Sequence, residues 1–278
     1  MDTLFGHVLS ASARGSIVIA VALALRALLR RAPKKYICYL WILTGLRLLN
    51  PFPPESAWSL QPRGLMLSMG QWQALEQYGN NLSILWMLGA AAMLFYSVIT
   101  YVALKLRLRE AIRIGPEVWE SDRIDTAFVL GYIRPSIYLP MRIQGLYREL
   151  MLKHERCHLK RLDHWLKLFG FVALAVHWFN PLVWMAYVLL CWDVEFACDE
   201  LVISDMDLEQ RKHYSEALLA CSSKGSFLGA TPVAFGEKPI SQRIRAVLGY
   251  RKPALWVSAL AIGALVLVAI CFLTNPIA

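Results

Sequence analysis

Two histidines and a glutamate are the residues of this sequence best placed to do chemistry. The segment Leu152–Leu159 reads LKHERCHL, so His154 and His158 are four residues apart and Glu155 follows the first of them. In a helix, residues four apart share one face, which lets two imidazoles bind the same metal ion. A carboxylate beside the first histidine can take a proton from a metal-bound water. This HExxH pattern predicts one zinc ion per chain, with His154 and His158 as ligands and Glu155 as the catalytic base.

The helical phase of the segment favours a site that faces inward. A charged stripe follows one side of the predicted helix: Glu149, Lys153, Arg156 and Lys160. Charges at spacings of three and four mark the solvated face, so the histidines lie on the other side. The alternative is structural: two polar histidines on a membrane-proximal surface, with Glu155 paired to a basic side chain. A third ligand would separate the two interpretations, because catalytic zinc takes three protein ligands and a water.

The segment Asp193–Glu200, with the sequence DVEFACDE, offers that third ligand. Glu195 and Asp199 are four residues apart, on one face of a second predicted helix. We expect Glu195 to bind the metal and Asp199 to hydrogen-bond a ligand histidine, a contact that fixes the imidazole. The alternative for Glu195 is an interfacial carboxylate paired with a basic residue. Asp163 is expected either to orient the site or to form a salt bridge at a helix end.

Glu195 can reach the histidines only if the apolar run at 166–192 folds back on itself. Asn180 and Pro181 lie in its middle, where proline removes a backbone donor and favours a break. We predict a hairpin of two helices of about 12 residues, each ~18 Å long at 1.5 Å per residue. Such helices are too short to cross ~30 Å of hydrocarbon.

The residues before the histidine motif have a composition typical of β-strands. Residues 126–133 and 136–139 are rich in β-branched and aromatic side chains and are separated by Arg134-Pro135. They predict a sheet of two or three strands, followed by a long helix from about Gln144. We expect one edge strand to pair with the backbone of an extended substrate. That strand consists of Ala127, Phe128, Val129, Leu130 and Gly131.

Composition places these motifs in a membrane protein. Of the 278 residues, 57% are hydrophobic and 18% are charged, which is too apolar for an ordinary soluble domain. Length and composition predict spans at 4–29, 36–52, 83–104 and 253–273. The expected fold is mainly α and multi-pass, with a gluzincin-like metalloprotease domain and a small β-sheet. Residues 1–104 are expected to form three transmembrane helices, with an external loop at 53–82. Residues 105–252 are expected to form a cytoplasmic domain that includes the hairpin. Residues 253–278 are expected to form a fourth transmembrane helix and a short external tail.

Basic residues set the expected orientation. They cluster at 26–35, 105–113 and 243–252, whereas the loop at 53–82 has few. Because basic loops stay in the cytoplasm, we expect the 105–252 domain inside and both termini outside. The excess of 29 Lys+Arg over 20 Asp+Glu has the same explanation, so we expect contact with lipid and no direct binding of nucleic acid. The six cysteines form no CxxC pair and are expected to be reduced.

Taken together, the motifs resemble a known family. HExxH followed by ExxxD is similar to the gluzincin metallopeptidases. More narrowly, the sequence resembles the β-lactam sensor-transducer (antirepressor) family of integral membrane zinc metallopeptidases. Four segments carry this resemblance: FVLGYIRPSIYLP at 128–140, HERCHLKRLD at 154–163, WFNPLVW at 178–184 and EFACDE at 195–200. The resemblance implies zinc at His154, His158 and Glu195, with Glu155 catalytic. It also implies a bacterial cytoplasmic membrane and a cytoplasmic transcriptional repressor as substrate.

The sequence departs from that family at its C-terminal end. The best-known members continue into an extracellular penicillin-binding sensor, whereas this sequence ends at Ala278, shortly after the last predicted span. Three explanations stay open: a truncated chain, a sensor on a separate protein, or a different signal. We therefore expect the protease core and leave β-lactam sensing open.

The sequence predicts a membrane-embedded zinc endopeptidase that cleaves a cytoplasmic or juxtamembrane regulatory protein in transmembrane signalling; the resemblance adds an antibiotic response. The alternatives are a housekeeping metalloprotease resembling the heat-shock or prenyl-protein endopeptidases, and a non-catalytic membrane signal transducer. Glu155 argues against the last, because a structural zinc site needs no general base. The signal, the cleavage site and the oligomeric state, a homodimer included, do not follow from the sequence. Three residues are unranked choices for stabilising the oxyanion: Tyr132, Tyr138 and His213.

Overall fold

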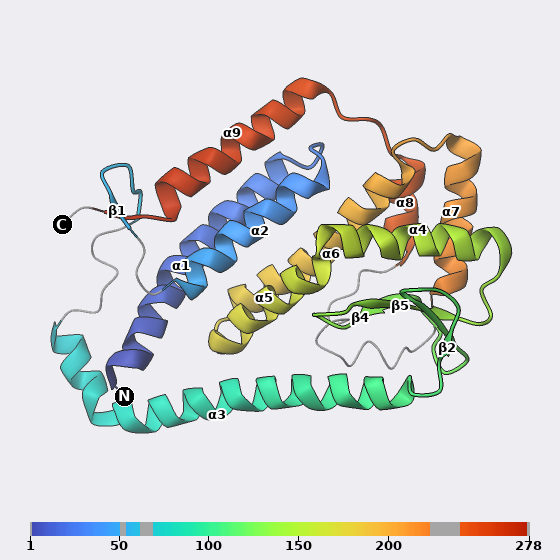
Figure 1. Ribbon diagram of the computed structural model, residues 1–278. Helices are drawn as coiled ribbons and strands as arrows, with labels where there is room; N and C mark the ends of the chain where they lie inside the picture. Colours follow the sequence, from blue (N-terminus) through green and yellow to red (C-terminus); the bar gives the residue numbers. More distant parts are fainter. Residues whose placement is uncertain (1, 51–53, 62–68, 223–239, 277–278) are drawn as a thin grey trace. The chain divides into compact units, whose positions relative to one another are not determined.

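The computed structural model describes residues 2–50, 54–61, 69–222 and 240–276, and within these ranges the chain is mainly helical with a small sheet (Figure 1). It divides into two compact units. The first, which we call the helix unit, contains Met1–Tyr96, Phe169–Leu190 and Pro253–Ala278. The second, which we call the sheet unit, contains Ser97–Leu168 and Cys191–Lys252. The predicted fold class, a mainly helical multi-pass protein with a small β-sheet, is confirmed.

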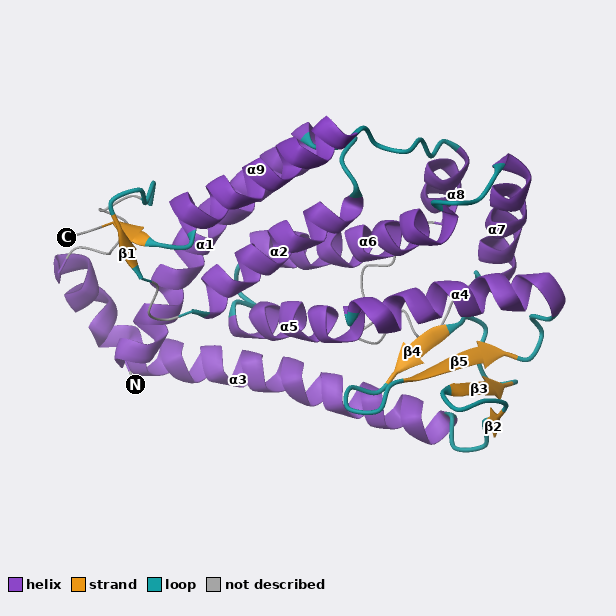
Figure 2. Ribbon diagram, turned by 45° about the horizontal axis from the view of Figure 1, so that its top comes forward, coloured by secondary structure: helices purple, strands orange, loops and turns teal. Residues whose placement is uncertain are grey.

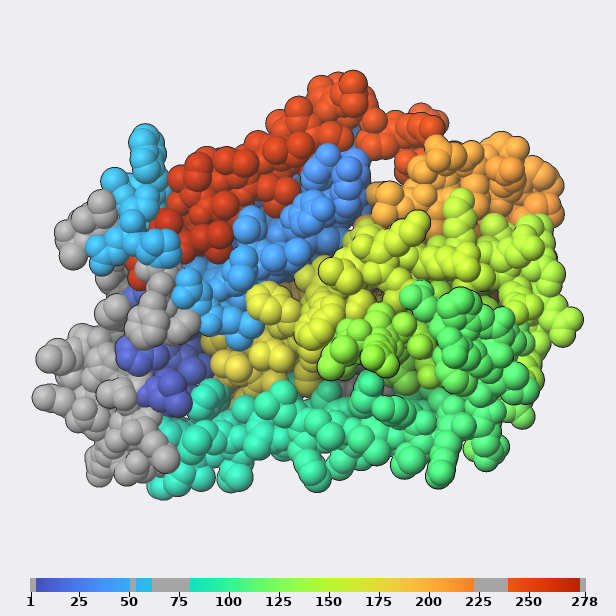
Figure 3. Space-filling model, in the orientation of Figure 1, coloured from blue at the N-terminus to red at the C-terminus, as the bar shows by residue number. Residues whose placement is uncertain are grey.

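Helices α1 (Asp2–Leu28) and α2 (Lys34–Leu49) form an antiparallel pair in the helix unit. Gly15 of α1 makes the close approach possible, because a Cβ there would lie 2.3 Å from Cδ2 of Leu48. Helix α9 (Leu255–Phe272) packs against α2, and the space-filling view shows the side chains of these two helices in direct contact (Figure 3).

The end of α9 is tied to the loop that follows α2. Strand β1 (Glu55–Ser56) pairs in parallel with β6 (Asn275–Pro276). The backbone N–H of Leu60 donates to the carbonyl of Cys271 at 2.9 Å. The ladder and this bond hold the residues after α9 in a fixed position.

Four helical segments are long and apolar enough to cross a membrane: 4–28, 81–107, 181–203 and 255–272. Three of them correspond to predicted spans. The fourth, 181–203, contradicts the expectation that both helices of the hairpin are too short to cross a membrane. Helix α2, predicted as a span at 36–52, has only 16 residues. Helix α3 (Met69–Arg107) begins well before residue 83, so much of the predicted loop at 53–82 is helical.

Helices α5 (Asp163–Val176) and α6 (Pro181–Ile203) form the apolar hairpin, and the break falls at Asn180-Pro181 as predicted. The Oδ1 atom of Asn180 accepts the backbone N–H of Leu182 at 2.9 Å, and Pro181 takes the first helical position, where no N–H is needed. The predicted length of about 12 residues is wrong for α6, which has 23. The helix continues past Trp192 because the acidic side chains that follow are paired within the sheet unit.

The sheet has four strands in the order β2-β3-β5-β4 (Figure 2). Their bounds are Ile112–Arg113, Val118–Ser121, Phe128–Leu130 and Ser136–Pro140 for β2 to β5. Within this four-stranded sheet, β3 and β5 pair in parallel, and the other two pairs are antiparallel. The expected sheet of two or three strands was therefore too small, since β2 and β3 are short and carry little apolar pattern. Within the described residues β4 pairs with one neighbour alone, so it is an edge strand.

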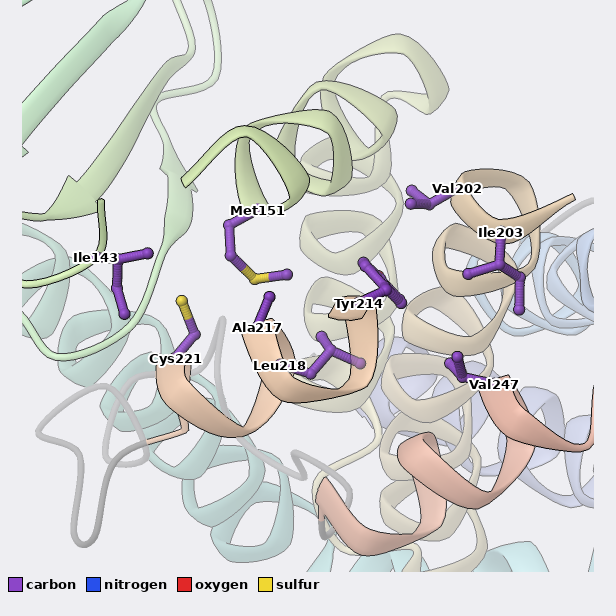
Figure 4. Close-up of a cluster of buried hydrophobic side chains, with 9 residues drawn as sticks. All are labelled: Ile143, Met151, Val202, Ile203, Tyr214, Ala217, Leu218, Cys221 and Val247. Carbon is purple, nitrogen blue, oxygen red and sulfur yellow. The ribbon is translucent and has the colours of Figure 1, made fainter. Parts of the chain in front are cut away.

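Helix α4 (Gly145–Arg161) carries the histidine motif and begins where the sequence predicted. It packs on β4 and β5 and on α7 (Leu208–Cys221), which in turn contacts α8 (Ile240–Leu248). The apolar cluster between these helices and the end of α6 is drawn in Figure 4 and consists of Ile143, Met151, Val202, Ile203, Tyr214, Ala217, Leu218, Cys221 and Val247. The Gly/Ser-rich stretch at 222–229 lies, except for Ser222, outside the described residues.

The turn after β4 gives a test of this fold. Gly131 has φ +106°, and a Cβ there would lie 2.9 Å from the carbonyl oxygen of Arg134. Gly145, at φ +58°, would meet nothing within 4 Å. We expect Gly131→Ala to lower the free energy of unfolding by ~1–3 kcal/mol, through both backbone strain and collision. Gly145→Ala should lower it by no more than ~1–2 kcal/mol. Thermal unfolding of the full chain in detergent measures both, and an equal loss would contradict the collision.

Candidate metal centre

The imidazoles of His154 and His158 face each other one turn apart on α4. Both side chains are buried, and their Nε2 atoms are 3.1 Å apart. The rings are nearly perpendicular. The inward orientation that the charged stripe indicated is thus present.

The other nitrogen of each imidazole is engaged by a buried oxygen. The Nδ1 atom of His158 lies 2.8 Å from Oδ2 of Asp163 and donates to this carboxylate. The hydroxyl of Tyr214 lies 2.8 Å from Nδ1 of His154 and donates to Oδ1 of Asp199 at 2.6 Å. Because that hydroxyl gives its proton to Asp199, its oxygen accepts from Nδ1–H of His154. The two Nε2 atoms are therefore left to present lone pairs to a shared cation.

Glu195 of α6 closes the group. Its carboxylate oxygens lie 3.4 Å from Nε2 of His154 and 3.5 Å from Nε2 of His158. Tetrahedral ligands with bonds of about 2.0–2.1 Å have neighbouring atoms ~3.3 Å apart. The nitrogen–nitrogen separation and the distances from Oε2 to His154 and from Oε1 to His158 are close to that spacing. With one or both oxygens of Glu195, these residues could hold one zinc-sized ion.

Two half-buried cations pair with the acidic groups. The Nζ atom of Lys167 donates to Glu195 at 3.1 Å. Arg243 of α8 donates from Nε and Nη2 to the two oxygens of Asp199 at 2.8 and 2.7 Å, and its Nη1 lies 3.3 Å from Glu195. Its Nη2 also lies 3.3 Å from Nε2 of His154, the atom that a metal would use. The guanidinium thus fixes Asp199 and borders the proposed ion position.

A strained turn places Asp163. Leu162, which ends α4, has a left-handed backbone with φ 57° and ψ 34°, a conformation that costs a non-glycine residue ~1–2 kcal/mol. The turn starts α5 at once and brings Asp163 back to His158. Asp163 also accepts from Nε of Arg161 at 3.2 Å. Asp163 therefore makes both contacts that were expected as alternatives: it holds the ring of His158 and forms a salt bridge with Arg161.

Glu155 is buried beside His154 on the same helix. Cys198 is a competing ligand by position, because His154, His158 and Cys198 offer ligand atoms within 4.8 Å of one another. Its Sγ lies 4.0 Å from Oδ2 of Asp163 and 3.7 Å from the carbonyl of His154. Cys198 is therefore the alternative third ligand to Glu195.

The unranked choices for the oxyanion lie elsewhere. Tyr132 stacks on Tyr101, Tyr138 stacks between Phe128 and Trp119, and exposed His213 faces Glu216. Strand β4 covers Phe128–Leu130, so the expected substrate strand loses Ala127 and Gly131 at its ends.

Three residues of the site were not predicted for these positions: Lys167, Tyr214 and Arg243. A signal for Tyr214 exists, because it shares with Ala217, Leu218 and Cys221 the spacing of one buried helix face. Lys167 is one turn after Asp163 and so shares its face. Arg243 belongs to the basic cluster at 243–252, which in the sequence indicated only the side of the membrane on which this segment lies.

The chain belongs to the M56 peptidase family, whose description, BlaR1 peptidase M56, matches residues 67–247, more than half of its length. It is thus a member of a membrane metallopeptidase family, and the predicted resemblance is confirmed. Among individual proteins it is similar to the regulatory protein BlaR1 of Bacillus licheniformis, with 30% identity over 193 residues, or 60% of this chain and 32% of that protein. The methicillin resistance mecR1 proteins of Staphylococcus aureus strain Mu50 and Staphylococcus epidermidis are 27% identical over 106 residues, or 37% of this chain and 18% of theirs. The chain therefore matches a third or less of each relative's length.

The buried carboxylates predict a pH effect on the metal-free protein. Burial alone would lower the pKa of His158, but Glu195 and Asp163 outweigh it and raise the pKa to about 10. A raised pKa stabilises the fold fully below the ordinary value of 6.5, and this stabilisation is lost as the pH rises through 10. Chelator-treated protein should therefore unfold at lower temperature as the pH rises from 7 to 10. With Asp163→Asn the pKa of His158 in the folded state should be lower, so the decline should be smaller and should end at lower pH. An unchanged profile would contradict the assigned pair.

The Tyr214 hydroxyl should matter for metal affinity. Tyr214→Phe leaves Nδ1 of His154 and one oxygen of Asp199 without their shared partner, and loss of such a contact weakens metal binding ~10–100-fold. Competition with a chromophoric chelator measures this. Tyr147→Phe is the matched control, since the Tyr147 hydroxyl bonds exposed Glu216. Equal affinities of the two variants would refute the role of Tyr214.

Proposed function

We propose that this protein is a membrane-embedded zinc endopeptidase that uses the cluster on α4 and α6. One observation carries the proposal: Glu195, 41 positions after His154 in the sequence, lies within 3.5 Å of both facing Nε2 atoms. Two neutral imidazoles and one carboxylate are the protein ligands of a hydrolytic zinc site that leaves one position open. Membership of a metallopeptidase family agrees with this ligand set.

In this proposal each side chain has a distinct part. His154, His158 and Glu195 hold the zinc ion, which when bound supplies a Lewis acid for the scissile carbonyl. Glu155 takes the proton of the attacking water and passes it to the leaving amine. Asp163 holds the ring of His158, whereas Asp199 acts on His154 chiefly through the Tyr214 hydroxyl. Lys167 and Arg243 keep the buried carboxylates ionised.

Strand β4 supports an endopeptidase mode of substrate binding. It is an edge strand of the described sheet and packs beside α4, the helix that bears the histidines. The edge of a sheet offers N–H and C=O groups to an extended peptide, and in β-augmentation these main-chain hydrogen bonds supply the affinity. Residues 128–130 are therefore our choice for the substrate strand.

The substrate we propose is a cytoplasmic or juxtamembrane regulatory protein of the repressor kind. The support comes from the relatives, one printed as a regulatory protein and the others as methicillin resistance proteins. The clusters of basic residues at 26–35, 105–113 and 243–252 support a cytoplasmic position for the sheet unit and external termini. A role in an antibiotic response and a homodimer belong to the same proposal.

Glu155→Gln separates catalysis from metal binding. We expect cleavage to fall by ~10²–10⁴-fold because the proton acceptor is lost, while zinc content stays at one per chain. Glu149→Gln, on the exposed side of the same helix, should retain activity. The readout is the set of membrane and cytoplasmic proteins that accumulate uncut in cells with each variant. Wild-type cleavage by Glu155→Gln would remove this residue from its role, and an accumulating set of misfolded membrane proteins would favour the housekeeping alternative.

Glu195→Gln tests the third ligand. We expect zinc content after dialysis to fall well below one per chain, because a neutral amide binds zinc more weakly than a carboxylate does. Elemental analysis of the full chain in detergent measures this, again with Glu149→Gln as control. Full zinc retention by Glu195→Gln would refute the assignment and turn attention to Cys198.

A further inference from the structure

Two arginines of the helix unit meet at one neutral side chain. Nη1 of Arg14, halfway along α1, donates to Oδ1 of Asn275 at 3.3 Å. Nη2 of Arg47, near the end of α2, donates to the same oxygen at 2.9 Å. Three segments that are distant in sequence thus bring two positive charges to a single amide.

Neither charge is balanced by the residues that the structure describes. Arg47 is only 2% exposed, and its Nε is buried without a hydrogen-bond partner. Asn275 is the only described side chain that accepts from either guanidinium, and no described carboxylate lies within 4 Å of them. A buried charge is costly unless it is paired and hydrogen-bonded, and a guanidinium has five N–H donors to satisfy. The pair therefore has unused donors and surplus positive charge.

Arg243 of the sheet unit differs from this pair. Its guanidinium contacts two carboxylates, Asp199 and Glu195. At Arg14 and Arg47 the counter-charge has to come from outside the described residues.

The acceptor between the arginines is firmly held. The backbone N–H of Asn275 donates to the carbonyl of Pro54 at 2.8 Å, and the Ser59 hydroxyl donates to the carbonyl of Thr274 at 2.8 Å. Because the Oδ1 atom of Asn275 faces both guanidiniums, its amide N–H groups remain as additional donors. The three side chains thus bring several hydrogen-bond donors to one place.

We propose that Arg14, Arg47 and Asn275 form a binding site for an oxyanion, and specifically for a phosphate group. Guanidinium forks match the oxygens of phosphate, and hydrogen bonds to a charged acceptor are about twice as strong as neutral ones. The phosphate can belong to an anionic lipid headgroup or to a soluble anion, since both present the same oxygens. The site is independent of the proposed peptidase centre.

The test uses the full chain, purified in a neutral detergent. The unfolding temperature is measured with inorganic phosphate against chloride at equal ionic strength, and in nanodiscs of phosphatidylglycerol against phosphatidylcholine. We expect stabilisation by phosphate, by phosphatidylglycerol or by both, and the responding arm identifies the source. Arg47→Gln should weaken the apparent affinity at least ten-fold, whereas Arg31→Gln, which removes an exposed charge, should leave it unchanged. No response in either arm, or equal responses of these two variants, would overturn the proposal.

Asn275→Asp keeps the test decisive if Arg47→Gln does not fold. An aspartate there supplies the missing negative charge from within the chain. We expect this variant to unfold at higher temperature than wild type without added oxyanion and to lose the response to phosphate or phosphatidylglycerol. A lower unfolding temperature, or an undiminished response, would refute a site that needs an external anion.

Discussion

The arrangement of the polar residues in the sheet unit depends on two imidazole nitrogens, the Nε2 atoms of His154 and His158, which are 3.1 Å apart. Each ring is held by a buried oxygen on its far side, so both Nε2 atoms must face the same point, and that point needs a positive charge. In the metal-free protein Glu195 and Asp163 outweigh the effect of burial and raise the pKa of His158 to about 10. A divalent ion bound at this point would take the place of that positive charge. The neighbouring groups serve to keep this arrangement from relaxing.

Those neighbours come from four helices, which explains why the apolar cluster of Figure 4 adjoins the polar one. Tyr214 belongs to both, since its ring is fully buried in the apolar cluster and its hydroxyl joins His154 to Asp199. A shift of α7 would therefore disturb packing and ring orientation at once. Arg243 links α8 to the same carboxylate. The helix unit shows the opposite electrostatic situation, with two arginines and a neutral amide, so the two units differ in how they balance buried charge.

The parts of the site that the sequence revealed are those encoded by short spacing. His154, Glu155 and His158 lie within one helical turn, and Glu195 with Asp199 within another, so periodicity alone defined their faces. Asn180-Pro181 located the reversal of the hairpin because proline excludes a continuous helix. The full length of α6 was missed, since the change from apolar to acidic residues at Trp192 resembles a boundary until the partners of the acids are known. Tyr214 and Arg243 reach the site only through tertiary packing, and β3 joins β5 in parallel across an intervening strand, which local pattern does not encode.

The placement of Glu195 and Asp199 on one stretch of α6 has a consequence for how the site could respond to change. Successive residues of a helix are separated by 100°, so rotation of α6 by a single step would carry both carboxylates away from the imidazoles together. The ion would lose a ligand at the moment when His154 loses its orienting acid. The third ligand and the group that orients His154 therefore depend on the rotation of one helix.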